Sequence, residues 1–347
     1  MSDLPSTSLP YYQTSIIPFY PTSISWQKSA NETNIAHQVR QETFRQLLPL
    51  WTANISENLK QIRKGRSILD IPKPTTTKAL IVGAGPSVLL RGHLDFLAKE
   101  SAKGNLGNTA IFATDRILGY LIWRNVKVDY VVSADGSPKI AEFYHRLFAK
   151  RSLEHYSYPP PVTLLNAGTI HNETLERVRD LGLSIAWYNH IWDSPNGHLT
   201  EFLISLTGKP AIPAGGDTGS TAWSLAATLG VRNIGLVGFD YSESPERPWE
   251  SYSYWDTHLK DCGGDAEKAK ERYKLVEYDT SEWGPVKAWV DAGWGVYREV
   301  TLQLLREVGV KYGVTTSNLT EGGVLVGEPL ILARLEEWLK NTFPQIF

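Results

Sequence analysis

The sequence ALIVGAGPS, residues 79–87, decides the fold of this chain, because an apolar run typical of a buried β-strand ends there in two glycines, a proline and a serine. A helical pattern follows directly, so the segment predicts a turn from strand into helix. Gly83 and Gly85 allow the backbone to approach a ligand closely, and Pro86 suits a first helical turn because its missing N–H is not needed there. Together with the hydroxyl of Ser87, these features are typical of a phosphate-binding turn.

Two common nucleotide-binding motifs do not fit this loop. The dinucleotide fingerprint requires a small residue where this chain has Val88, and no acidic residue closes a predicted second strand about 20 residues further on. The GxxxxGK[ST] loop is also absent. The sequence therefore argues against a nicotinamide enzyme and against an ordinary P-loop kinase, and a purely structural tight turn stays an alternative for this segment alone.

Composition limits the class of protein. The chain has 347 residues and 42% hydrophobic content, enough for one large or two ordinary domains. Its net charge is −2, and scattered Lys and Arg residues do not form the basic stripe of a nucleic-acid binder. The single cysteine, Cys262, excludes an intramolecular disulfide and suits a reducing compartment. No run approaches the ~20 apolar residues of a membrane span, and no leader pattern is present, so we expect a cytoplasmic protein without membrane or nucleic-acid partners.

The chain divides into four predicted parts. Residues 1–70 form an N-terminal arm, rich in Pro, Ser, Thr and Tyr, and a long amphipathic helix or helix pair over 34–64, where apolar residues recur at three- and four-residue steps and Pro49 could kink the helix. Residues 71–241 are expected to form a Rossmann-like domain. An aromatic insert over 242–295 and a C-terminal α/β completion over 296–347 follow.

Short β-rich runs alternate with helical ones after residue 78. The predicted strands are 79–82, 109–113, 130–134, 162–165, 184–187, 211–214 and 234–237. This alternation predicts an α/β fold with a doubly wound, mostly parallel sheet. In such sheets ligands bind beyond the carboxyl ends of the strands, at the topological switch point. Residues directly after each strand are therefore the candidates for function.

Carboxylates follow three of these strands. Asp115 follows the second strand, Asp135 lies in a Ser-x-Asp-Gly turn after the third, and Asp240 follows the strand at 234–237. Asp135 and Asp240 could hold Mg²⁺ or a ribose, because Mg²⁺ favours one or two carboxylates together with substrate phosphates. Asp115 and Asp135 could equally be turn or helix-capping residues.

A second glycine-rich segment, PAGGDTGST over residues 213–221, repeats the logic of the first loop before another helical stretch. Its candidate anion-binding residues are Gly215, Gly216, Asp217, Thr218 and Ser220. Two such helix starts in one parallel sheet predict a nucleotide and a second small substrate, with both loops facing one cleft.

The insert over 242–295 contains five of the 12 tryptophans of the chain. A segment this rich in aromatic residues could be a lid that stacks on a planar ring of a ligand. Alternatively, it could pack on the core or on a second subunit of a homo-oligomer. His258 is the only histidine of the insert and a candidate catalytic base, although a lone histidine is more often structural. The polar segment 315–323 predicts a turn before an amphipathic helix over 329–339.

Taken together, these segments resemble the DUF115 or MptE-like family, which includes archaeal 6-hydroxymethyl-7,8-dihydropterin pyrophosphokinases and the motility accessory factors of flagellin glycosylation. The loop at 83–87, the strand ending in Asp135 and the block from 215 to 240 match in order, and 317–323 is similar to the closing turn of the motility-factor branch. The resemblance covers about residues 45–325. Many members carry Asn or Ser where this chain has Asp115, and the family also resembles sialyltransferases.

The resemblance implies a transferase with three alternatives. The leading hypothesis is ATP-dependent diphosphoryl transfer to a pterin alcohol, in which Asp135 binds Mg²⁺, Asp240 assists catalysis, and Asp115 and the two glycine loops contact the nucleotide. The alternative is glycosyl transfer from a nucleotide-activated sugar, with His258 or an acidic residue deprotonating the acceptor hydroxyl. The third is a non-catalytic nucleotide-binding adaptor.

Overall fold

The computed structural model of this chain describes residues 32–149, 162–193 and 197–340, with the side chains of 32–45 and 145–149 left aside. The predicted N-terminal arm over 1–30 lies outside the described residues. Within the part described, no helix is both long and apolar enough to cross a membrane.

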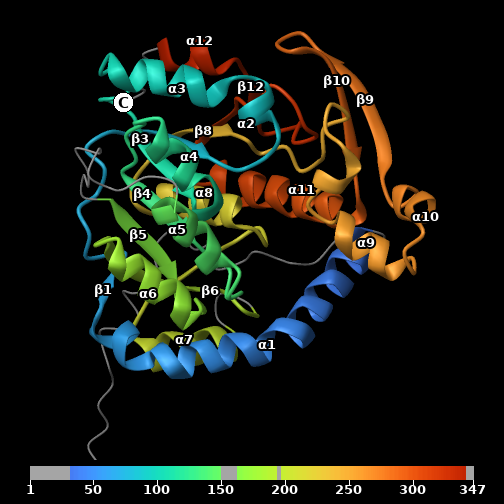
Figure 1. Ribbon diagram of the computed structural model, residues 1–347. Helices are drawn as coiled ribbons and strands as arrows, with labels where there is room; N and C mark the ends of the chain where they lie inside the picture. Colours follow the sequence, from blue (N-terminus) through green and yellow to red (C-terminus); the bar gives the residue numbers. More distant parts are fainter. Residues whose placement is uncertain (1–31, 150–161, 194–196, 341–347) are drawn as a thin grey trace, which may run out of the picture.

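A ten-stranded sheet forms the centre of the molecule, and its strands run in the order β1-β6-β5-β4-β3-β2-β8-β11-β12, with β7 beside β6 (Figure 1). Every pairing in this sheet is parallel. The strands are β1 (Arg66–Ser67), β2 (Lys78–Val82), β3 (Ala110–Thr114), β4 (Tyr130–Ser133), β5 (Thr163–Ala167), β6 (Ser184–His190), β7 (Ala211–Ile212), β8 (Asn233–Val237), β11 (Thr315–Asn318) and β12 (Ile331–Leu332). The predicted α/β doubly wound fold is confirmed, and the sheet includes strands from outside 71–241.

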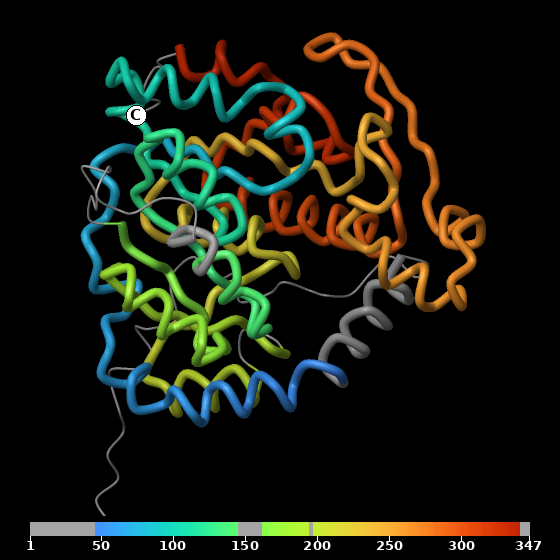
Figure 2. Tube along the Cα trace, in the orientation of Figure 1, coloured from blue at the N-terminus to red at the C-terminus, as the bar shows by residue number. Residues whose placement is uncertain are grey.

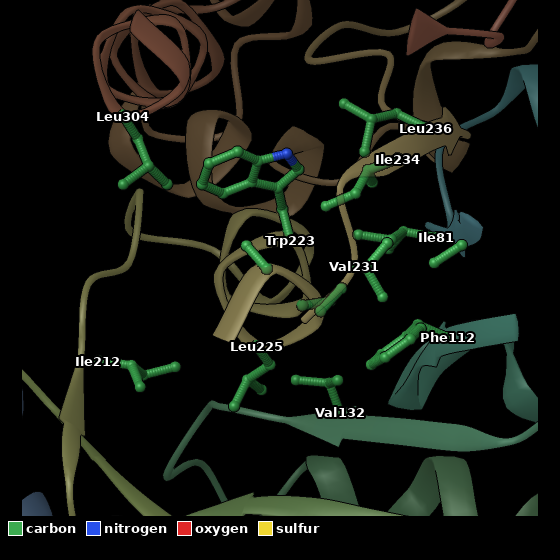
Figure 3. Close-up of a cluster of buried hydrophobic side chains, with 14 of the residues drawn as sticks. Ile81, Phe112, Val132, Ile212, Trp223, Leu225, Val231, Ile234, Leu236 and Leu304 are labelled. Carbon is green, nitrogen blue, oxygen red and sulfur yellow. The ribbon is translucent and has the colours of Figure 1, made fainter. Parts of the chain in front are cut away.

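Alternate residues of each strand enter two apolar layers. In β2, Leu80 and Val82 pack in one layer with the helices α2 to α5 and α12, whereas Ala79 and Ile81 pack in the other with α8 and α11. Trp223 of α8 is the largest side chain of this second layer and lies among side chains of the sheet and of α11 (Figure 3). The helices with their bounds are α2 (Ser87–Leu90), α3 (His93–Ala102), α4 (Asp115–Trp123), α5 (Ile140–Ala149), α6 (Asn172–Asp180), α7 (His198–Thr207), α8 (Thr218–Thr228), α11 (Ala292–Leu304) and α12 (Leu335–Lys340).

The long helix α1 (Glu32–Lys64) confirms the helical periodicity predicted over 34–64, with Pro49 inside it. It lies over the carboxyl ends of β4 and β5. The Asn54 amide donates to the carbonyl oxygens of Gly136, at 2.9 Å, and Thr169, at 2.8 Å. Gly136 has to be glycine at this contact, because a Cβ there would lie 2.6 Å from the Thr169 carbonyl oxygen.

The C-terminal part differs from the sequence prediction. The segment 315–323, predicted as a turn, begins with β11, a buried strand between β8 and β12. Its polar side chains are compatible with burial because they are paired: Trp223 Nε1 donates to Thr316 Oγ1 at 3.0 Å, and Asn318 Nδ2 donates to the Leu325 carbonyl oxygen. The predicted helix over 329–339 is replaced by β12 and the shorter α12.

The insert over 242–295 stands at one side of the molecule (Figure 2). It contains the 3₁₀ turn η2 (Trp249–Ser251), the helices α9 (Trp255–Asp261) and α10 (Ala266–Lys270), and the antiparallel hairpin of β9 (Lys274–Thr280) and β10 (Gly284–Val290). Trp249 is the centre of its apolar cluster, with ring centroids 4.9–5.9 Å from those of Tyr252, Trp255, Tyr273 and Trp289. Most insert aromatics therefore pack on each other.

Candidate functional site

The topological switch point lies between β2 and β8. From β2 the chain builds β3, β4, β5 and β6 toward one edge of the sheet, and it then returns to place β8 and β11 on the other side of β2. Ligands of doubly wound sheets bind where the strand order reverses, at the carboxyl ends. Both glycine loops lie at the carboxyl ends of the strands.

The first glycine loop packs tightly against the chain that follows β8. A Cβ on Gly83 would lie 2.7 Å from the Gly238 carbonyl oxygen, and a Cβ on Gly85 would lie 2.0 Å from Asp240 Oδ2. Directly after Pro86, Ser87 donates to Asp240 through its hydroxyl at 2.7 Å and its backbone N–H at 3.2 Å. The donors expected to bind a phosphate are thus occupied by a carboxylate of the chain itself.

Asp240 is a buried carboxyl, 4% exposed. Burial raises its pKa to about 7, the hydrogen bonds from Ser87 oppose this shift, and the nearby Glu243 charge adds to it. Asp240 therefore exchanges a proton near neutral pH. Its contacts are with Ser87, so its predicted catalytic role stays a prediction.

The second glycine loop is organised by Asp217. Asp217 Oδ1 accepts from the Ser220 N–H at 2.9 Å and caps α8, which begins at Thr218, and Ser220 Oγ accepts from the Gly215 N–H at 2.9 Å. Gly216 has a φ of 90°, which disfavours any other residue. Burial raises the pKa of Asp217, against the hydrogen bonds that it accepts.

Residues 239–241 connect the two loops. Asp240 contacts Ser87 of the first loop, while the Tyr241 hydroxyl donates to Asp217 Oδ2 of the second at 2.9 Å. The Phe239 ring packs so closely on Gly219 that a Cβ there would lie 2.7 Å from it. Both loops therefore lie at the same edge of the sheet, as the sequence predicts.

Asp115 and Asp135 lie at the ends of the neighbouring strands β3 and β4. Asp115 is 5% exposed and accepts from the Arg116 N–H at 2.8 Å and from Ser133 Oγ at 3.0 Å. Burial raises its pKa to about 7, and the Asp135 charge contributes. Asp135 is exposed and accepts from the Ser137 N–H at 2.8 Å in an Asx turn. Asp115 is thus an internal carboxyl, and Asp135 is the one that a ligand can reach.

His258 pairs with a buried carboxylate. Its Nε2 lies 3.1 Å from Oδ2 of Asp291, which is 2% exposed and caps α11 by accepting from the Trp294 N–H at 2.7 Å. Tyr254, one turn before His258, packs on Trp294 with ring centroids 5.3 Å apart. This arrangement fixes the imidazole beside a buried carboxylate, as in general-base pairs.

Tyr297 of α11 links these groups. Burial raises its pKa, and the charges of Asp217, Asp135 and Asp291 add to the effect. A Cβ on Gly216 would lie 3.1 Å from the Tyr297 ring. Tyr297 thus lies over the second glycine loop, within electrostatic range of the exposed Asp135 and of the carboxylate that pairs with His258.

Comparison with known proteins identifies the family. Residues 53–246 match the family model described as 6-hydroxymethylpterin diphosphokinase MptE-like. The chain belongs to this MptE-like family. A solved structure, described as the MAf glycosyltransferase from Magnetospirillum magneticum AMB-1, is similar in fold with a TM-score of 0.53 and 18% sequence identity, over 82% of this chain and 37% of that one. The chain thus spans well under half the length of that protein, and a search of curated proteins found no match.

The match to the MptE-like family ends before most of the insert. It includes both glycine loops, Asp115, Asp135 and Asp240, whereas His258, Asp291 and Tyr297 lie beyond residue 246. Sequence reasoning named His258 but missed Asp291 and Tyr297. A signal for Asp291 exists, since an Asp directly before a helical pattern is a capping residue. Nothing local marks Tyr297, whose neighbours come from distant segments.

Some of the buried polar atoms without hydrogen-bond partners lie at the carboxyl ends of the strands of this MptE-like sheet. Among the described residues, no hydrogen bond reaches Thr114 Oγ1 at the end of β3, either amide atom of Asn166 near the end of β5, or His190 Nε2 at the end of β6. Burial lowers the pKa of His190 to about 4, so its imidazole is neutral. Because buried polar groups in proteins are nearly always paired, these atoms are candidates for contact with a bound molecule or a water.

Asp135 is the residue of this region whose chemistry suits a magnesium ion. The described residues contain no group of three or more His, Cys, Asp or Glu side chains that could hold a metal by themselves. Mg²⁺ often needs only one or two carboxylates, because substrate phosphates and water complete its coordination. Asp135 fits this requirement, since it is exposed and its second oxygen accepts no hydrogen bond from the described residues.

Proposed function

We propose that this chain is a nucleotide-dependent transferase that moves a glycosyl group from a nucleotide-activated sugar to the hydroxyl of a second small substrate. The MptE-like family and the fold of the glycosyltransferase neighbour support a transferase. The nucleotide would lie across the carboxyl ends of β3 and β4, between the two glycine loops. The observation that carries glycosyl transfer is the pair formed by His258 and Asp291.

The pair supplies the base that this reaction needs. With the Nε2 proton directed to Asp291, the Nδ1 atom of a neutral His258 accepts the proton of the acceptor hydroxyl. The acceptor oxygen forms a bond to the anomeric carbon while the bond from that carbon to the nucleotide phosphate breaks. The phosphate leaves with the bonding electrons, and the buried Asp291 stabilises the imidazolium that forms.

The negative charge at the carboxyl ends of the strands favours a donor with few phosphate groups. The exposed carboxylate of Asp135 lies beside the proposed nucleotide position, and the helix-start donors at Ser87 and Ser220 are occupied by Asp240 and Asp217. A triphosphate brings more negative charge to this place than a sugar nucleotide does, and like charges repel at close range. A sugar nucleotide is therefore the better match.

Diphosphoryl transfer from ATP to a pterin alcohol is the second candidate, favoured by the open carboxylate of Asp135 and by the description of the family model. Mg²⁺ bound at Asp135 would neutralise phosphate charge. In this reaction the alcohol oxygen attacks the β-phosphorus, and AMP leaves with the bonding electrons. Asp135 would hold the metal, which in turn would position the phosphates.

The leaving nucleotide distinguishes the two reactions. The full chain is incubated with ATP, UDP-sugars or CMP-sugars and candidate acceptors, with Mg²⁺ or with a chelator, and released nucleotides are identified by mass spectrometry. Glycosyl transfer predicts release of UDP or CMP, and His258→Ala should lower turnover by about 10²–10⁴ without weakening donor binding. The matched control is His198→Ala, an exposed histidine at the start of α7.

Two results would contradict glycosyl transfer. Release of AMP from ATP that requires Mg²⁺ and disappears in Asp135→Asn would assign diphosphoryl transfer instead. Nucleotide binding without turnover of any donor would assign a binding adaptor. Equal losses in His258→Ala and His198→Ala would remove the imidazole from the reaction.

A further inference from the structure

A cluster of buried polar side chains lies at the carboxyl ends of three neighbouring strands. Asp115 begins α4 directly after β3, and Ser133 ends β4. Asn166 is the next-to-last residue of β5, and Tyr144 comes from α5. Asp115 is 5% exposed, and the other three residues are fully buried. Three strand ends and a helix therefore bring polar groups to a place that solvent does not reach.

Ser133 is the centre of this cluster. Its hydroxyl donates to Asp115 Oδ2 at 3.0 Å. In the parallel pairing of β4 with β5, Ser133 is the register partner of Asn166. Both side chains face the layer of α2 to α5, because Val131 and Leu164, two positions earlier in the same strands, pack in that layer. Ser133 and Asn166 are thus neighbours on one face of the sheet.

Tyr144 packs in the same layer from the side of α5. Burial raises the pKa of its hydroxyl well above the usual value, and the Asp115 charge adds to this shift. Tyr144 is therefore a neutral phenol within electrostatic range of Asp115. The hydroxyl has no hydrogen-bond partner in the described part of the chain, and neither amide atom of Asn166 has one.

The cluster holds a buried carboxyl without a cationic partner. Asp115 accepts hydrogen bonds from the Arg116 N–H and from Ser133, but no ion pair to it occurs within residues 46–144, 162–193 and 197–340. The Arg116 side chain itself is exposed. Because an uncompensated charge is costly in a protein interior, an occupant of this place has to supply positive charge as well as partners for polar atoms.

The oxygen atoms of the cluster define that occupant. They are one carboxylate, two hydroxyls and one amide oxygen, which are hard ligands with a single negative charge among them. One positive charge balances this set. Ca²⁺ takes about 6–8 oxygens, and Mg²⁺ gives up its waters reluctantly, so divalent ions match a small and fully buried set less well.

We infer that this cluster binds a monovalent alkali cation, of the size of Na⁺ or K⁺. Its oxygen ligands are Asp115, Ser133, Tyr144 and Asn166. The cation neutralises the buried carboxylate and joins the ends of β3, β4 and β5 two positions before Asp135. This inference does not depend on the proposed transferase function.

Thermal unfolding of the full chain tests the site. The protein is kept in tetramethylammonium chloride at pH 8, above the pKa of about 7 to which burial raises Asp115, and NaCl or KCl replaces that salt at constant ionic strength. Constant ionic strength keeps the screening of surface charges equal. We expect an alkali cation to raise the unfolding midpoint by about 2–5 °C at roughly tenfold above its Kd, because it binds the folded state alone.

Three variants remove ligands of the cation. Asp115→Asn removes the charge, and Asn166→Leu removes both amide atoms with little change in volume. Each should abolish the difference between alkali and tetramethylammonium chloride. Tyr144→Phe, the mildest change, should raise the cation concentration that gives half of the effect. The matched control is Tyr120→Phe, at a tyrosine of α4 that is 40% exposed, and it should leave this concentration unchanged.

The inference is overturned if NaCl, KCl and tetramethylammonium chloride give the same midpoint, which would assign water molecules to the cluster. It is also overturned if Asp115→Asn and Tyr144→Phe keep the full alkali effect, because the cation then binds elsewhere. Should Asp115→Asn or Asn166→Leu not fold, Tyr144→Phe and its control decide the question. None of these outcomes involves turnover, so they stand apart from the test of the proposed transfer.

Discussion

At the scale of single residues, the features that predict a ligand loop serve internal contacts. Gly85 has no side chain because Asp240 occupies that space, and Ser87 donates to the same carboxylate. Sequence reasoning correctly identified glycines that permit a close approach, but it could not tell whether a ligand or another part of the chain approaches. That distinction depends on Asp240, which lies 153 positions from Ser87 in the sequence.

Buried carboxyls give the stability of this chain a characteristic pH dependence. Burial raises the pKa of Asp240 from 3.8 to about 7, so between these values the folded chain keeps a proton that the unfolded chain releases. Raising the pH through this range therefore lowers the free energy of unfolding, by an amount on the order of 2–4 kcal/mol for one such group. Asp240→Asn should reduce this decline, measured by urea unfolding at pH 5, 6, 7 and 8.

The control is Asp261→Asn, at an exposed carboxyl at the end of α9, which should keep the slope of the unmodified chain. Asp115, with its pKa also raised to about 7 by burial, leaves a residual slope in Asp240→Asn. A slope identical in Asp240→Asn and the unmodified chain would mean that Asp240 is ionised in the folded state throughout.

At the scale of helices and strands, the sequence predicts those elements whose buried side chains are apolar. The runs that became β2, β3, β4 and β8 were predicted closely, because both faces of a central parallel strand are apolar. β11 was missed, because its Thr, Ser and Asn residues are buried through hydrogen bonds from distant segments. The two-residue β1 and β12 give no periodic signal at all.

Two buried asparagines of α1, Asn54 and Asn58, donate hydrogen bonds to backbone carbonyl oxygens of the body. Asn54 is 3% exposed, and its amide donates to the carbonyl oxygens of Gly136 and Thr169. Asn54→Ala would leave these carbonyls unpaired and should lower the free energy of unfolding by about 1–3 kcal/mol, measured by urea unfolding. Asn172→Ala, which removes an exposed hydrogen bond to Glu176, should change it by less than about 0.5 kcal/mol. Equal effects would show that α1 does not depend on this contact.

At the scale of the whole molecule, the candidate site combines two parts with different origins in the chain. The glycine loops and the strand-end carboxylates come from the region that matches the MptE-like family, and the proposed base, its carboxylate and Tyr297 come from beyond it. Sequence patterns locate the first part because each loop follows a strand. Sequence patterns do not show that the second part lies at the same carboxyl ends of the strands, because only tertiary contacts place the insert there.

Contacts that tie the insert to the body include the hydrogen bond from the Tyr278 hydroxyl to the Gly323 carbonyl oxygen, the hydrogen bond from Trp283 Nε1 to the Ala333 carbonyl oxygen, and the packing of the Trp294 ring on Tyr241. A lid that closes over a nucleotide should tighten where it contacts the site, because closure excludes water and completes the catalytic groups. We therefore expect bound nucleotide to slow hydrogen exchange over 254–258 and 291–297 more than at the hairpin tip over 280–284. Mass-spectrometric exchange with and without nucleotide measures this difference. Equal exchange in both states across the whole insert would identify it as a fixed part of the molecule, and a uniform slowing would indicate stabilisation of the whole fold without closure.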